Sequence, residues 1–197
     1  LPKFISMVII TTLVWMLLSE KGIFLGSTPG VIAKLLVNIG VVSEAEAVQG
    51  IMFQSQYFRA IYIMTGIWEG AGYGSIVYFA AVIAISPTNY EAAQIDGAGK
   101  MAQMRYVVLP AMLSTIVIML IVRIGSLLSI GFEQVLLMRH NQTYETAQVI
   151  STFALDLKES GQVNLSTVPE MINNLTSMLL VIGANLISRK ATETSLY

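Results

Sequence analysis

Long apolar stretches separated by polar connectors are the main pattern of this chain. A helix needs roughly 20 mostly apolar residues to cross the hydrocarbon core of a bilayer. Four stretches reach or approach that length, at about residues 4–18, 60–85, 110–130 and 171–187. The pattern therefore predicts an all-α fold, a polytopic transmembrane helical bundle with about four spans. The chain opens on Leu1 without an initiator Met, so we expect further spans before it.

The connectors predict an orientation. Lys and Arg are enriched in cytoplasmic connectors of membrane proteins. The short connectors on one side carry five such residues: Lys3, Lys100, Arg105, Arg189 and Lys190. That side, with the C-terminus and the connector between the second and third spans, is expected to be cytoplasmic. The long connectors, about residues 19–59 and 131–170, are expected to face outward and to contain short helices.

Composition narrows the class of protein. Hydrophobic residues make up 55% of the chain, charged residues 12%, and the mean hydropathy is +0.70, as in a membrane protein. A net charge of −1 with scattered Lys and Arg argues against a nucleic-acid partner. No cysteine is present, which excludes disulfides and thiolate metal sites. The single histidine, His140, stands in a polar stretch and is interpreted as a solvated loop residue, so no metal site is expected.

The connector at residues 86–109 is predicted to form two short helices joined by a turn. Ser86 can cap the first helix, Pro87 suits its first position, and Gly97 is placed for the left-handed residue that ends it. The second helix, from about Lys100, is expected to stop before Pro110, because a residue that precedes proline is pushed out of the helical region. Spans on both sides would hold this connector as a rigid knob suited to docking.

The same connector resembles the EAA signature of binding-protein-dependent ABC permeases. The match comprises Glu91-Ala92-Ala93, then Gly97 preceded by Asp96, a β-branched residue at Val107 where the family usually has Ile, and Leu109-Pro110. Further segments resemble carbohydrate-importing permeases, in particular the polysaccharide-permease subgroup: Trp68-Glu69-Gly70, Gly131-Phe132-Glu133-Gln134, Tyr144-Glu145-Thr146-Ala147 and Thr194-Ser195-Leu196-Tyr197.

The resemblance implies a function and a set of partners. It implies the type I permease fold of an ABC importer over residues 1–197, in the bacterial cytoplasmic (inner) membrane, forming the path of a sugar or oligosaccharide. Its partners would be ABC ATPase subunits, a second permease subunit and an extracytoplasmic solute-binding protein. The chain has no Gly-rich phosphate loop, so no cofactor is expected in it, ATP would be bound and hydrolysed by the ATPase, and the chain itself would not be an enzyme.

The resemblance also assigns roles to residues of the connector and the spans. Glu91 would contact a basic group of the ATPase; the alternative is a solvated acid favoured by the helix dipole in a first turn. Residues expected to face the substrate path are Trp68, Gly70, Tyr73, Arg123, Leu127, Ile130 and Glu133. An ionised group inside a span is costly, so Arg123 is expected to face the path or to pair with Glu69 or Glu133. The glycines at 70, 72 and 74 would permit close packing or a break in the second span.

Two other classes of protein remain as alternatives. An ion-coupled secondary carrier would need carboxylates or a broken helix at mid-membrane, and Glu69 is the one candidate carboxylate. An intramembrane enzyme would need a pair such as Ser/His or Asp/Asp within the spans, and none is found in the sequence.

Overall fold

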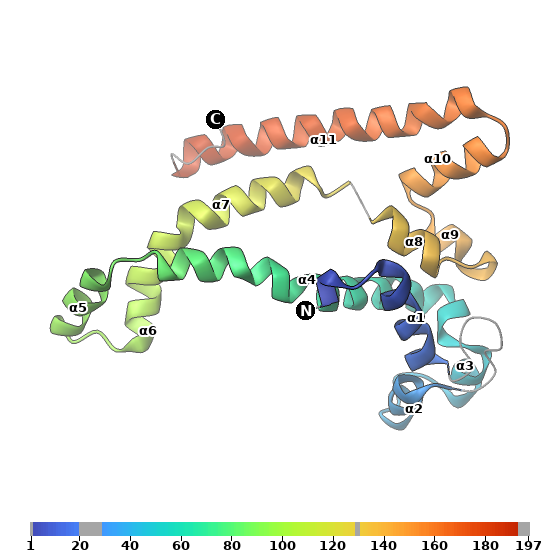
Figure 1. The fold of residues 1–197 in the computed structure, drawn as a ribbon, viewed down its shortest axis with the longest axis horizontal. Helices are drawn as coiled ribbons and strands as arrows, with labels where there is room; N and C mark the ends of the chain where they lie inside the picture. The colour runs from blue at the N-terminus through green and yellow to red at the C-terminus, as the bar shows by residue number, and fades with distance from the viewer. Residues whose placement is uncertain (1, 20–28, 129–130, 193–197) are drawn as a thin grey trace. The chain divides into compact units, whose positions relative to one another are not determined.

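The computed structural model describes residues 2–19, 29–128 and 131–192, and this part of the chain is almost entirely helical (Figure 1). Ser19 and Pro29 form an isolated antiparallel β-bridge. The predicted all-α fold is confirmed. In chain order the elements are η1 (Pro2–Phe4), α1 (Met7–Leu18), α2 (Val31–Asn38), α3 (Glu44–Gln49), η2 (Ile51–Phe53), α4 (Ser55–Ile83), α5 (Pro87–Ile95), α6 (Lys100–Gln103), η3 (Met104–Val108), α7 (Leu109–Gly125), α8 (Phe132–Met138), η4 (Asn141–Thr143), α9 (Tyr144–Ala147), α10 (Ile150–Glu159) and α11 (Val163–Thr192).

The long helices follow the apolar stretches of the sequence with different bounds. Among the described residues, the stretches Lys100–Gly125 and Val163–Arg189 are each long and apolar enough to cross a membrane. Helices α4 and α5, bent by 65° relative to each other, meet the same criterion only when they are taken together as one broken span. The apolar helix α1 has 12 residues. Helix α11 begins eight residues before the predicted span and runs through Pro169, which costs one backbone hydrogen bond but does not end the helix.

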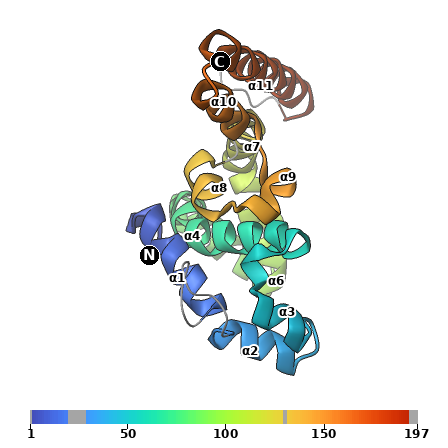
Figure 2. The same ribbon diagram turned by 90° about the vertical axis from the view of Figure 1, so that its right-hand side faces the viewer.

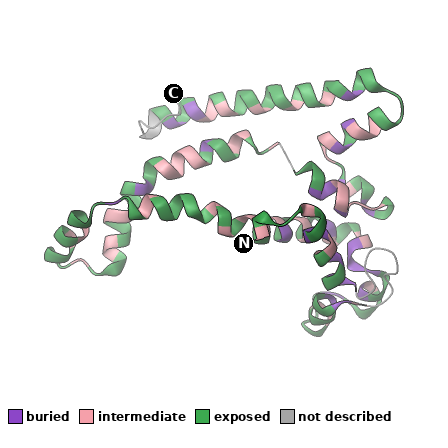
Figure 3. Ribbon diagram, in the orientation of Figure 1, coloured by how far each residue is buried: buried purple, intermediate pink, exposed green. Residues whose placement is uncertain are grey.

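The chain divides into two compact units, and the first comprises residues 1–72 and 130–170. Its core gathers buried side chains from α1, α4 and α8, among them Trp15, Phe58, Val135 and Met138. Figure 3 shows this concentration of buried residues on α1 and α8. The two long connectors contain short helices, as predicted: α2 and α3 lie in the first connector, and α8, α9 and α10 lie in the second (Figure 2).

His140 is half-buried and packs against aromatic rings beside this core. Its ring packs edge to face against Phe53 and Trp15, with ring centroids 4.6 and 5.6 Å apart, and Trp15 packs in the same way against Phe53 at 5.3 Å. The interpretation of His140 as a solvated residue was wrong, because segments distant in the sequence bring two aromatic rings to it. Within the described residues no group of three His, Cys, Asp or Glu side chains is arranged to hold a metal.

Gly30, the residue before α2, lies very close to the backbone at the C-terminal end of α1. Its N–H donates to the carbonyl of Leu18 at 3.1 Å. A Cβ at this position would lie under 3.0 Å from the carbonyl oxygens of Leu17 and Met16. Only glycine therefore fits here, since the obstacle is backbone and cannot rotate away.

The second unit comprises residues 73–129 and 171–197, of which 73–128 and 171–192 are described. Here α7 and α11 pack together: the side chain of Val181 closely approaches Gly125, and Asn173 donates from Nδ2 to the carbonyl of Leu128 at 3.4 Å. Asn185 and Ser188 are buried on the same helix. Small and polar residues at a helix contact are typical of membrane proteins, where they permit close approach and hydrogen bonding.

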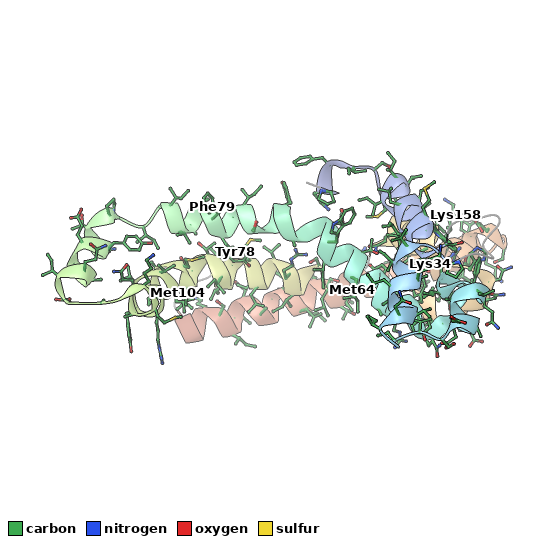
Figure 4. All side chains as sticks on the ribbon, turned by 90° about the horizontal axis from the view of Figure 1, so that it is seen from below. Lys34, Met64, Tyr78, Phe79, Met104 and Lys158 are labelled. Atoms are coloured by element: carbon green, nitrogen blue, oxygen red, sulfur yellow. The ribbon has the colours of Figure 1, made fainter. Side chains whose placement is uncertain are left out.

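Helix α4 is continuous through its three glycines. A Cβ added to Gly70 or Gly74 would have no atom of the described residues within 4 Å, so in this part of the chain these glycines neither break the helix nor admit a close neighbour. Large apolar side chains such as Met64 and Phe79 stand exposed along α4 at 66% and 67% (Figure 4). A face of this kind suits lipid or another protein rather than water.

Candidate functional site

The connector at 86–109 begins with α5, and its first position is Pro87, as predicted. Ser86 precedes it but makes no side-chain cap. Its hydroxyl donates instead to the hydroxyl of Thr88 at 3.2 Å, while its carbonyl accepts from the N–H of Asn89 at 3.0 Å. Ser86 thus stands at the N-cap position as predicted, without the side-chain hydrogen bond that a capping serine can make.

Gly97 ends α5 in the left-handed conformation, which confirms the predicted turn. Its φ is +75°. The N–H of Gly97 donates to the carbonyl of Gln94 at 3.0 Å, and the N–H of Ala98 donates to that of Ala93 at 2.8 Å. These two bonds form a Schellman motif with Asp96 at the C-cap. The Ala93 and Asp96 positions of the signature therefore serve this helix end.

The second half of the connector does not stop before Pro110. Helix α6 continues through the π-helical turn η3 into α7, and Leu109 itself is helical with φ −59° and ψ −46°. The expected break was wrong. Proline in a helix lacks an N–H and crowds the carbonyl four residues earlier, and a π turn changes the hydrogen-bond register just where this conflict would arise. Residues 100–125 thus form one helical stretch.

The connector is exposed or half-buried along its whole length (Figure 3). No residue of α5 is buried, and Glu91 is exposed. Ile95 is 87% exposed, and Met101 and Tyr106 are each 72% exposed. Inside the connector, Gln103 donates from Nε2 to the carbonyl of Ala98 at 2.9 Å and so ties the second helix to the turn. The connector is a folded surface with an exposed apolar face, which is what a docking element requires.

Glu91 does not occupy a helix first turn. It is the fifth residue of α5, and no acidic residue lies in the first turn of that helix. Stabilisation by the helix dipole falls off within the first turn. The dipole therefore does not explain an acid at this position.

The residues predicted for the substrate path are divided between the two units. In the first unit, Trp68 is 51% exposed and Glu133 is exposed, and Gly70 has open space around it. In the second, Tyr73 and Leu127 are 50% and 64% exposed, and Arg123 is exposed near the end of α7. Ile130, Thr194, Ser195, Leu196 and Tyr197 lie outside the described residues. The roles predicted for Ile130 and for the six described path residues stay predictions.

An ion pair that sequence reasoning missed lies in the first unit. The ammonium of Lys3 donates to Oε1 of Glu69 at 2.9 Å, and Glu69 lies in the middle of α4. Lys3 therefore lies beside the middle of α4 rather than beside one of its ends, and the orientation inferred in part from its charge stays a prediction. No local pattern could reveal this pair, since 66 residues separate its members. The pairing of Glu69 also leaves less reason to assign it to a coupling ion.

A second polar group joins the short helices of the first unit. Arg139 donates to both carboxylate oxygens of Asp156 at 3.1 and 2.9 Å, and the hydroxyl of Tyr144 donates to the same carboxylate at 2.6 Å. The hydrogen bonds from Arg139 hold the pKa of Asp156 below its ordinary value, and the bond to Asp156 raises the pKa of Tyr144. This group fixes α8, α9 and α10 against one another.

Comparison with known proteins assigns the chain to a family. Residues 2–138 match the family described as binding-protein-dependent transport system inner membrane component. The polygalacturonan/rhamnogalacturonan transport system permease protein YteP of Bacillus subtilis (strain 168) is 36% identical over 199 residues, and Protein LplB of the same organism is 32% identical over 197. Each alignment covers all of this chain and 58% of the relative, so the chain spans less than two thirds of these proteins.

Solved structures agree with this assignment. A bacterial ABC transporter involved in the import of the acidic polysaccharide alginate superposes with a TM-score of 0.84 at 36% identity, over 97% of this chain and 63% of that one. The bacterial alginate ABC transporter in complex with an alginate pentasaccharide-bound periplasmic protein gives 0.86 at 36% identity, over 100% and 64%. The family, the helical fold and the EAA connector all lead to one conclusion: the chain belongs to the family of binding-protein-dependent ABC transporter permeases, whose members are multi-pass proteins of the inner membrane.

Proposed function

We propose that this chain lines the membrane path of an oligosaccharide importer and couples that path to a separate cytoplasmic ATPase through the connector at 86–109. The observation that carries the proposal is the connector itself: a Schellman turn at Gly97 fixes two short helices, and α6 runs without a break into α7. A displacement of the connector would therefore be transmitted along a continuous helix of 26 residues. The ATPase would bind and hydrolyse ATP.

The remaining partners follow from the same proposal. A second permease subunit would cover the exposed apolar faces of the long helices, and a solute-binding protein would deliver substrate on the opposite side from the connector. A relative is named for polygalacturonan and rhamnogalacturonan transport, and two similar structures are of alginate importers, which supports an oligosaccharide as substrate. The connector and the C-terminal end of α11 would lie in the cytoplasm.

Reversal of one charge in the connector tests the coupling. Glu91→Lys leaves the turn at Gly97 intact but reverses the charge offered to the ATPase. In the complex reconstituted with its ATPase and binding protein, we expect this variant to lose stimulation of ATP hydrolysis by loaded binding protein and to retain less ATPase on purification. Full stimulation in Glu91→Lys would mean that the connector is not the coupling element.

A matched control exists outside the connector. Glu159 is an exposed acid in α10, a helix of 10 residues that compares with the 9 of α5. Glu159→Lys changes the net charge by the same amount, and a Lys in the last turn of a helix is favourable. Wild-type stimulation in Glu159→Lys together with its loss in Glu91→Lys assigns the effect to the connector.

A further inference from the structure

The Lys3–Glu69 pair lies at the midpoint of a helix expected to cross the membrane. Glu69 is 14 residues from Ser55 and 14 from Ile83, the two ends of α4. At about 1.5 Å per residue each end is roughly 21 Å away along the helix axis. A hydrocarbon core is about 30 Å thick, so the pair lies near its middle. Ionised side chains at that depth face the interior of the protein or a water-filled path, and they mark functional sites.

The two members of the pair are unequally enclosed. The side chain of Glu69 is 15% exposed, whereas that of Lys3 is 46% exposed. The carboxylate is thus covered and the ammonium is presented outward. Lys3 donates one of its three N–H groups to Glu69, and within the described residues it has no second acceptor. The other two donors are available to a ligand.

Aromatic side chains flank both charges in the sequence. Phe4 follows Lys3 and is 74% exposed, and Trp68 precedes Glu69 and is 51% exposed. An aromatic face offers a stacking surface to the apolar side of a sugar ring, and an ammonium offers hydrogen bonds and charge to a carboxylate. A neutral glycan would need only the first of these features. A uronate, which carries a carboxylate on each ring, would use both.

We propose that Lys3 is a charge-selecting contact for the carboxylates of an acidic oligosaccharide, and that Glu69 is the positioning residue that holds it. The inference rests on the proposed function, because it requires that this chain lines the path. The enclosed carboxylate holds the ammonium of Lys3 in one orientation between transport events. A passing uronate then accepts hydrogen bonds from the two remaining donors, so the path favours a polyanion over a neutral chain of the same length.

Four forms of the complex separate selection from helix packing. The double variant Lys3→Met/Glu69→Gln removes both charges at once and leaves no unpaired ion. The swap Lys3→Glu/Glu69→Lys keeps an ion pair but places the acid at the outward position. Lys3→Arg keeps the outward cation and is the conservative control. Wild type is the reference, and each is reconstituted in proteoliposomes with the ATPase and saturating loaded binding protein.

The readout is the uptake rate of trigalacturonate, with its methyl ester as the uncharged probe of equal length. We expect Lys3→Arg to match wild type, and both double variants to lose roughly tenfold in uptake of the free acid, the effect of one charge-assisted hydrogen bond. Uptake of the ester should be unchanged. The binding protein is the same throughout, so differences among variants belong to the permease.

Several results would contradict the inference. Wild-type uptake of the free acid in the swap or the neutral variant would show that the pair only packs helices, and failure of both to assemble would show the same; either result overturns the inference. If wild type imports neither probe although the complex assembles, the proposed function fails and this inference with it. If wild type imports the free acid and the Lys3 variants import it at the same rate, the inference about Lys3 is refuted and the proposed function still stands.

Discussion

Gly97 offers the sharpest test of how the connector keeps its shape. The perturbation is Gly97→Ser, which adds a Cβ and one hydroxyl at a residue with φ +75°. No atom of the described residues lies within 4 Å of the added Cβ, so the substitution meets no steric obstacle there. Its cost is therefore purely conformational. A residue with a Cβ in the left-handed region costs about 1–2 kcal/mol, which reduces the population of the native turn roughly 5- to 30-fold relative to alternatives.

The same connector contains the matched control. Gly99 also has open space around its Cβ position, but its φ is −68°, which any residue adopts, and it is the N-cap of α6, where serine is favoured. Gly99→Ser thus adds the same atoms without the strain. Gly97→Asn is an intermediate case, since asparagine tolerates the left-handed region better than serine does.

The assay is stimulation of ATP hydrolysis by loaded binding protein in the reconstituted complex, with thermal unfolding of the permease measured in parallel. We expect Gly99→Ser to keep the most stimulation, Gly97→Asn to keep less and Gly97→Ser to keep the least. The spans should be equally stable in all three variants. Equal stimulation in Gly97→Ser and Gly99→Ser would show that the Schellman turn does not set the docking geometry of the connector.

Four further substitutions test other parts of the structure. Arg123→Ala should reduce oligosaccharide uptake at normal expression, because Arg123 is exposed and has no carboxylate partner in the described part of its own unit; reduced expression instead would indicate a packing role. Gly30→Ala should lower the free energy of unfolding by about 1–3 kcal/mol through overpacking, whereas Gly74→Ala, in open space within a helix, should raise it by up to about 1 kcal/mol in the same thermal assay. Asp156→Asn should cost about 1–2 kcal/mol at pH 7. Because the folded-state pKa of Asp156 is lowered, this difference from wild type should be lost as the pH falls below 3.8 towards the lowered pKa, and a difference that persists there would contradict the assignment.

Features that depend on neighbouring residues were predictable from the sequence. The left-handed turn at Gly97 follows from small residues and a helix end within a few positions, and Pro87 at the start of α5 follows from its fixed φ. The apolar stretches predicted the long helices because a membrane imposes a minimum length of apolar residues. Pro110 shows the limit of such rules. The restriction on a residue before proline is a statistical preference, and a π turn in a helix anchored at both ends accommodates it.

Features that depend on contacts between distant segments were not predictable. The charge of Lys3 resembles a connector charge in its local sequence, and its location at the middle of α4 follows only from the path of η1 past that helix. His140 resembles a polar loop residue until α1 and η2 place two aromatic rings against it. Both surroundings have one physical cause: the segments that pack on a side chain decide how polar its environment is. In a membrane protein this matters most for charges, because an ion misplaced by half the bilayer thickness changes from a topology marker into a functional group.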